Sequence, residues 1–244
     1  AVPIESLTSG GKRLLAGRII ERIPNHKCYI EVFAGAAWLL FKKEPSKYEI
    51  INDINSDLVC LYRVVKLHLE EFVRYLKWIL VARDEFERFK KEDPAALTDI
   101  QRAVRYYYLL RNCFSSQMAK PHFAASTIRV PRFNLLRIEE ELSDAHLRLA
   151  QVVIENRYYQ RILTQYDKPH SFFYIDPPYW DCEDYYGKGL WAKEDFTRLR
   201  DILTGLKGKF LMSINDVPEI RQLYKGFEIE AVETTYTAGG GNKK

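Results

Sequence analysis

Short apolar segments with the length and composition of buried β-strands recur along this 244-residue chain, and helical segments separate most of them. These strand-like segments are residues 29–33, 48–51, 152–155, 171–175, 209–214 and 227–234. Alternation of strands and helices is typical of an α/β fold with a mostly parallel sheet. The alternation is interrupted after residue 57 by long segments with helical patterns, at 58–89 and 99–110. We therefore predict an α/β domain formed by residues 1–57 and 151–244, with an inserted, mainly helical lobe at 58–150.

The first predicted strand leads directly into a turn of small residues, Ala34-Gly35-Ala36-Ala37, and then into an apolar helix. Small residues at a strand-to-helix turn allow a ligand to approach the backbone, and the helix N-terminus carries a partial positive charge. The next strand ends at Asn52-Asp53, where a carboxylate can accept hydrogen bonds from both hydroxyls of an adenosine ribose. The turn lacks the G-x-G-x-x-G pattern of pyrophosphate-binding sites. These features favour a nucleoside cofactor without a pyrophosphate, although Gly35 and Asp53 could also be only a turn residue and a solvated cap.

The predicted strand at 171–175 ends at Asp176-Pro177-Pro178-Tyr179. Two prolines stop a strand, because proline has no N–H to donate to a neighbouring strand. The Asp176 carboxylate and the Pro177 carbonyl are then two acceptors facing one small volume. When two acceptors hold the hydrogens of an aromatic amino group, its nitrogen can use its lone pair to attack the methyl group of a sulfonium cofactor. Tyr179 offers a ring on which a base taken out of the duplex can stack. The alternative is a turn without a chemical role.

With these motifs in this order, the chain resembles the Dam-like, or alpha, class of DNA adenine methyltransferases. The matching motifs are Glu31-Val32-Phe33-Ala34-Gly35-Ala36, Asn52-Asp53-Ile54-Asn55, Asp176-Pro177-Pro178-Tyr179 and the N-terminal Gly10-Gly11-Lys12-Arg13. The resemblance implies a Rossmann-like methyltransferase sheet and methyl transfer from S-adenosyl-L-methionine to the exocyclic amino nitrogen of a flipped adenine in DNA. It also implies cofactor contacts from Gly10, Gly11, Lys12, Phe33, Ala34, Gly35, Ala36, Asp53 and Asp176.

The chain departs from this class in two places. Where relatives often carry an acid that helps to hold the cofactor's adenine, this chain has Tyr158, which we therefore include among the expected cofactor contacts. Relatives also tend to continue beyond the glycine run at 239–241 into one more antiparallel strand, whereas this sequence stops at Lys244. Because it also begins with Ala1, we expect that one or both ends are missing.

The segment from residue 111 to residue 137 combines basic and aromatic residues and contains neither Asp nor Glu. Such a composition suits a loop or hairpin that contacts DNA phosphates and base edges and fills the gap left by a flipped base. The predicted DNA contacts are Arg111, Phe114, Lys120, Phe123, Arg129 and Arg132. An ordinary solvated loop is the alternative. The segment 181–191, rich in Gly and aromatic residues, suits either a mobile flap over the flipped base or a packed surface loop.

The remaining composition mainly excludes other classes of protein. Lys and Arg total 37 against 33 for Asp and Glu, so DNA binding would depend on this local cluster. The four cysteines and five histidines show no metal-ligand spacing, and we expect no metal. No apolar run has the roughly 18 residues of a membrane span. We expect a cytoplasmic monomer, encoded by a bacterium or phage, that acts on double-stranded DNA.

The sequence leaves three other activities open. Methylation of the cytosine amino nitrogen would use the same two acceptors. Methylation of RNA or of a protein amide would keep the fold, although the basic segment argues against a protein substrate. A DNA-binding module that has lost catalysis is the third possibility, and the intact residues 176–179 argue against it.

Overall fold

The computed structural model describes residues 11–113, 122–123, 135–183 and 189–233. Five of the predicted strands are present within these ranges: β1 (Cys28–Glu31), β2 (Tyr48–Asn52), β3 (Val153–Glu155), β4 (Ser171–Ile175) and β5 (Lys209–Met212). They form one sheet in the order β3-β2-β1-β4-β5, and every neighbouring pair is parallel. This confirms the predicted α/β class and its Rossmann-like sheet.

The strand predicted at 227–234 is wrong for the part that the structure describes, since residues 227–233 form no strand. Instead, the Phe227 ring packs on Phe210 of β5, with ring centroids 5.4 Å apart. Further along, Glu230 accepts hydrogen bonds from the Arg22 guanidinium. The segment's apolar and charged residues therefore make side-chain contacts in place of a ladder of backbone hydrogen bonds.

Helices cover both faces of the sheet, as its fully buried central strands require. Because side chains alternate along a strand, Ile30 packs in a core with α8 (Tyr159–Gln165), α9 (Lys193–Thr204) and α10 (Pro218–Leu223). Its neighbour Tyr29 points to the other face and packs in a second core, to which α1 (Gly11–Ile20), α2 (Trp38–Lys42) and α3 (Ser56–Leu67) contribute.

The helical segment predicted at 58–89 is divided among three helices: α3, α4 (Leu69–Leu76) and α5 (Arg83–Lys91). A short 3-10 turn (Pro94–Ala96), α6 (Asp99–Asn112) and α7 (Leu135–Leu149) complete this part of the chain. The start of α6 is fixed by a capping box, in which the Thr98 side chain and the Gln101 side chain satisfy each other's backbone N–H groups.

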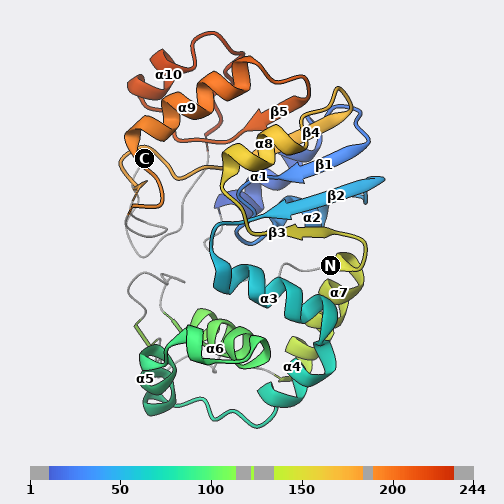
Figure 1. Cartoon of the computed structure of the whole chain (residues 1–244), viewed down its shortest axis with the longest axis vertical. Coiled ribbons are helices and arrows are strands. Elements are labelled where there is room, and N and C mark those ends of the chain that lie inside the picture. Colours follow the sequence, from blue (N-terminus) through green and yellow to red (C-terminus); the bar gives the residue numbers. More distant parts are fainter. Residues whose placement is uncertain (1–10, 114–121, 124–134, 184–188, 234–244) are drawn as a thin grey trace.

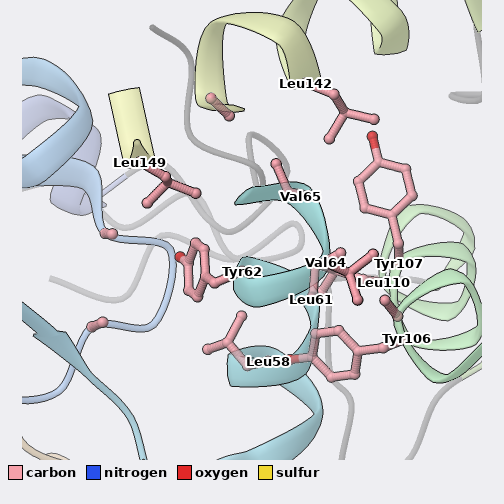
Figure 2. Close-up of a cluster of buried hydrophobic side chains, with 14 of the residues drawn as sticks. Leu58, Leu61, Tyr62, Val64, Val65, Tyr106, Tyr107, Leu110, Leu142 and Leu149 are labelled. Atoms are coloured by element: carbon pink, nitrogen blue, oxygen red, sulfur yellow. The ribbon is translucent and has the colours of Figure 1, made fainter. Parts of the chain in front are cut away.

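Helix α3 lies between the sheet and helices α5 and α6, and α7 runs alongside α3 (Figure 1). In Figure 2, Tyr62 of α3 points toward the sheet side, while Val64 faces Tyr107 of α6 on the opposite side. The core that contains Tyr29 of the sheet also contains these residues of α3 and α6. The lobe thus shares a hydrophobic core with one face of the sheet, and its bounds at 58 and 150 stay a prediction.

Within the described ranges, no helix combines the length and the apolar character needed to cross a bilayer.

Candidate functional site

The small-residue turn and residues 176–179 lie side by side at the carboxyl ends of two neighbouring strands. Strands β1 and β4 are parallel neighbours, with Glu31 paired with Tyr174 at their carboxyl ends. The chain adds β2 and β3 on one side of β1, and β4 and β5 on the other. Ligands of open α/β sheets bind at the carboxyl ends of the strands, where the order reverses in this way. The small-residue turn and residues 176–179 follow directly at that position.

The small-residue turn has the backbone conformation that the sequence suggests. Gly35 has φ = 47° and Ala37 has φ = 50°, so both are left-handed. An atom placed at the Cβ position of Gly35 would meet nothing within 4 Å. The space beside this backbone is therefore open to a ligand.

Asp53 is bound to this turn by a direct hydrogen bond. The Gly35 N–H donates to Oδ2 of Asp53 at 2.9 Å, and the Asn55 N–H donates to Oδ1 at 2.8 Å. Burial raises the pKa of the Asp53 carboxyl, while hydrogen bonds from Asn55, Gly35 and Ile54 act in the opposite direction. Each carboxylate oxygen has a second acceptor site, so the oriented Asp53 can still accept hydrogen bonds from two ribose hydroxyls.

Two asparagines to which the sequence analysis assigned no role hold the neighbouring loops together. Buried Asn52 donates to the carbonyls of Val32 (2.9 Å) and Arg157 (3.0 Å), and its Oδ1 accepts the Arg157 N–H at 2.8 Å. Asn156 donates to the Asp53 carbonyl at 2.7 Å. These bonds join the segments that follow β1, β2 and β3, and so set the position of Asp53.

The helical lobe also supports the turn. The Tyr62 hydroxyl of α3 donates to the Gly35 carbonyl at 2.6 Å. Because Tyr62 belongs to the core shared with the sheet, the turn is fixed from both the sheet and the lobe.

Asp176 is held by a chain of hydroxyl groups. The Ser213 hydroxyl, just after β5, donates to Oδ1 of Asp176 at 2.8 Å, and the Tyr174 hydroxyl lies 2.8 Å from Ser213 Oγ. A serine hydroxyl has one hydrogen, so when Ser213 donates to Asp176 the Tyr174 hydroxyl must donate to Ser213. This arrangement orients the Asp176 carboxylate.

The rest of the predicted catalytic motif is also fixed by its neighbours. Pro177 and Pro178 are buried, while Tyr179 is partly exposed. The next residue, Trp180, exchanges two hydrogen bonds with the Asn215 side chain, at 2.9 and 3.2 Å. Asn215 and Ser213 come from one segment after β5, which the sequence analysis did not connect with catalysis.

Glu31 is a buried acid beside this site. Its Oε1 accepts hydrogen bonds from the Tyr29 hydroxyl at 2.8 Å and from the Leu40 N–H of α2 at 2.6 Å. Burial raises the pKa of Glu31 to about 7, against the effects of these two donors and of Lys43, and the negative charge of Asp176 adds to the increase. Glu31 therefore caps α2 and lies within the electrostatic influence of Asp176.

An aromatic cluster flanks the turn on the other face of β1. Phe33 lies 5.7 Å from Tyr159 and 5.5 Å from Trp191, measured between ring centroids. Tyr159 is the first residue of α8, and Trp191 precedes α9. Phe33, a predicted cofactor contact, is thus held between two segments that meet at the site.

Tyr158 and the N-terminal motif are only partly located. Tyr158 is the N-cap residue of α8, with 64% of its surface exposed. Gly11 and Lys12 lie in the first turn of α1, while Gly10 lies outside the described residues. Their contacts with a cofactor stay predictions.

Arg111 is a correction to the predicted DNA surface. Its side chain is buried, with Nη2 2.8 Å from Glu141 Oε2 and with Nε donating to the Tyr107 hydroxyl at 2.9 Å. Its charge is needed inside the lobe, because a buried carboxylate requires a partner. We therefore leave Arg111 out of the proposed DNA surface.

Phe123 is the other predicted DNA contact that the structure describes. It forms an antiparallel bridge with Cys113, and its ring lies 5.4 Å from that of Phe86. Phe114, Lys120, Arg129 and Arg132 lie outside the described residues, as do residues 184–188 of the predicted flap.

Among the described residues, no three His, Cys, Asp or Glu side chains are grouped as metal ligands would be.

Comparison with known proteins agrees with this arrangement. Residues 9–238 match the model of the D12 class N6 adenine-specific DNA methyltransferase family. The chain is 26% identical over 232 residues to the type II methyltransferase M.CviBI of Paramecium bursaria Chlorella virus NC1A, covering 93% of this chain and 88% of that protein. It is 24% identical over 265 residues to the DNA adenine methylase of Escherichia coli (strain K12), covering 97% of this chain and 90% of that protein. The chain, with its paired motifs at the carboxyl ends of β1 and β4, belongs to the D12 class of N6 adenine-specific DNA methyltransferases.

Proposed function

We propose that this enzyme transfers a methyl group from S-adenosyl-L-methionine to the N6 atom of an adenine flipped out of double-stranded DNA. The observation that carries the proposal is the position of Asp176. It follows β4, beside the turn after β1, and Ser213 holds its carboxylate. A hydrogen-bonded acid and an open backbone turn thus occupy adjacent positions, as methyl transfer between two bound molecules requires.

The residues of the turn fit S-adenosyl-L-methionine. Asp53 is oriented to accept the ribose hydroxyls, and the open space beside Gly35 admits the sugar and its substituents close to the backbone. Phe33 supplies an apolar wall, and Gly10, Gly11, Lys12, Ala34, Ala36 and Tyr158 are the further proposed contacts. When bound, the cofactor supplies an electrophilic methyl group on a positively charged sulfur.

The proposed role of Asp176 and Pro177 is to hold the adenine amino group. The Asp176 carboxylate and the Pro177 carbonyl each accept one N–H, which favours a tetrahedral nitrogen with an available lone pair. Bound S-adenosyl-L-methionine would supply the methyl group that this nitrogen attacks, and its sulfur would keep the electron pair of the S–CH3 bond. The methylated nitrogen afterwards releases one proton to water, so the reaction needs no base before attack. Tyr179 and Pro178 form the stacking wall for the flipped base.

The test is transfer of labelled methyl from S-adenosyl-L-methionine to unmethylated plasmid DNA, followed by nucleoside analysis. Label in N6-methyladenine is expected. Asp176→Ala should abolish transfer and leave cofactor affinity nearly unchanged, and an equal loss of both would contradict the catalytic role. Label in N4-methylcytosine would keep the mechanism and change the base, whereas absence of both label and cofactor binding would favour a non-catalytic DNA-binding protein.

For the DNA surface, we propose Phe114, Lys120, Phe123, Arg129 and Arg132. Replacing both Arg129 and Arg132 with Ala should weaken DNA binding and reduce the slope of log affinity against log salt by about 2. Arg74→Ala is the matched control, because Arg74 is an exposed arginine of α4 paired with Glu71. An unchanged slope in the double variant would move the DNA surface away from this segment. We further propose that the enzyme acts as a cytoplasmic monomer without a metal.

A further inference from the structure

The indole nitrogen of Trp191 has no hydrogen-bond partner although it is buried. Trp191 is 5% exposed, and its Nε1 is the one buried side-chain nitrogen or oxygen among the described residues that lacks a partner. Burying an indole N–H without an acceptor costs free energy that an apolar ring without such a donor would not cost. An isolated buried donor of this kind needs a specific explanation.

The position of Trp191 suggests what the missing acceptor is. Its ring packs edge-on against Phe33, 5.5 Å away, and lies 5.1 Å from the ring of Tyr159. Phe33 leads into the Gly35 turn, and Tyr159 begins α8 just after β3. Trp191 therefore contacts both segments that border the proposed nucleoside pocket.

The neighbouring polar group shows that this cluster does not generally leave donors without acceptors. The ring of Tyr159 packs on the same indole, and the Tyr159 hydroxyl lies 3.0 Å from the Asp195 carboxylate. Phe33 and Phe196, the other two rings around Trp191, carry no acceptor of their own. None of these neighbouring rings therefore supplies an acceptor for the Trp191 N–H.

We infer that Trp191 is a positioning residue that donates its indole N–H to a ring nitrogen of the adenine of bound S-adenosyl-L-methionine. The ring nitrogens of adenine are acceptors, and the aromatic rings of Phe33 and Tyr159 suit its flat apolar faces. The inference rests on the proposed function, since it assigns a residue to the cofactor of that reaction. It adds a contact that no motif of the sequence indicates.

The first test is the binding of S-adenosylhomocysteine to the full chain by calorimetry. Trp191→Phe keeps an aromatic ring but removes the N–H donor together with part of the indole ring, and it should weaken binding about 5- to 30-fold, as loss of one buried hydrogen bond does. The melting temperature of the ligand-free variant is measured alongside, because loss of the larger ring also removes packing in the core. Trp78→Phe is the matched control, since Trp78 is 87% exposed and should change neither value.

A second test combines altered ligands with the same variant. S-adenosylhomocysteine analogues with one adenine ring nitrogen replaced by C–H (1-deaza, 3-deaza and 7-deaza) are bound to the natural chain and to Trp191→Phe. One analogue should bind the natural chain more weakly and should show no additional loss with the variant. That result would identify the accepting nitrogen.

The outcomes separate the inference from the function on which it rests. If the natural chain binds no S-adenosylhomocysteine, the proposed function fails. If the natural chain binds it, and Trp191→Phe binds equally well or loses affinity equally for all three analogues, the hydrogen bond is refuted while the function stands. A ligand-free variant that is less stable with unchanged affinity would likewise make Trp191 a purely structural residue.

Discussion

The backbone N–H of Gly35 donates a 2.9 Å hydrogen bond to Oδ2 of Asp53, and so links the turn after β1 to the end of β2. The other carboxylate oxygen accepts the Asn55 N–H. One side chain therefore fixes the shape of the turn and, in the proposed function, also holds the ribose. A substitution at this position should change both the fold and ligand binding.

Asp53→Ala should weaken S-adenosylhomocysteine binding more than about 10-fold, because both ribose acceptors are lost. It should also lower the free energy of unfolding by about 1–2 kcal/mol, since two backbone donors lose their acceptor. Calorimetry and urea denaturation measure the two effects separately. Gly35→Ala serves as a control for the turn itself, because the left-handed φ of 47° makes it mildly strained while Asp53 stays in place. Unchanged affinity in Asp53→Ala would place the ribose elsewhere.

Ser213→Ala should lower kcat about 10-fold and leave cofactor affinity and KM for DNA nearly unchanged, because the Asp176 carboxylate loses an orienting donor. Ser213→Thr keeps the hydroxyl and should restore most of the rate. Single-turnover methylation of plasmid DNA gives the rate of the chemical step. A variant that loses stability and DNA affinity together, with no specific effect on kcat, would show that Ser213 only packs the loop.

The contrast between Asp53 and Ser213 shows how far the sequence could predict the site. Asp53 and Asp176 each follow a predicted strand. The motifs and the strand pattern together therefore identified both as candidate site residues. Ser213 and Asn215 reach the site because β5 lies beside β4, and no spacing in the sequence reports that contact. Trp191 is likewise brought to Phe33 only by the packing of distant segments.

In the basic segment, by contrast, composition predicted a DNA contact that the structure places in the core of the lobe. Composition groups Arg111 with Arg129 and Arg132, although α6 ends at Asn112 and turns the Arg111 side chain into the lobe. The buried residues of α6 include every position from Ala103 to Asn112, so helical periodicity could not separate a core arginine from a DNA-contacting one. Glu141, its partner, is distant in the sequence.

Arg111→Ala should therefore act on stability. Removing the cation opposite the buried Glu141 should lower the free energy of unfolding by about 3 kcal/mol. Arg74→Ala, at an exposed ion pair, should cost less than about 0.5 kcal/mol. Urea denaturation gives both values. A stable Arg111→Ala variant with weaker, less salt-dependent DNA binding would restore Arg111 to the DNA surface.

Glu31 should make the stability of the ligand-free enzyme depend on pH. Its pKa is raised from 4.5 to about 7, mainly by burial, so the folded protein retains a proton that the unfolded chain releases at lower pH. The stabilising effect of the protonated form is complete below the unfolded pKa and is lost as pH rises through about 7. Four neighbouring groups act on this carboxyl: the Tyr29 hydroxyl and the Leu40 N–H donate hydrogen bonds to it, and Lys43 and Asp176 act through their charges.

Glu31→Gln keeps an oxygen that can accept from Tyr29 and Leu40 but cannot ionise. From pH 5 to pH 7.5, the free energy of unfolding of the natural chain should fall by on the order of 2 kcal/mol relative to that of the variant. Urea denaturation of both proteins across this range gives the difference directly, and titration of the histidines cancels because both proteins carry them. Parallel curves for the two proteins would mean that Glu31 is ionised throughout. Its hydrogen bond to the N-terminal turn of α2 would then be that of a carboxylate, which the positive end of the helix stabilises.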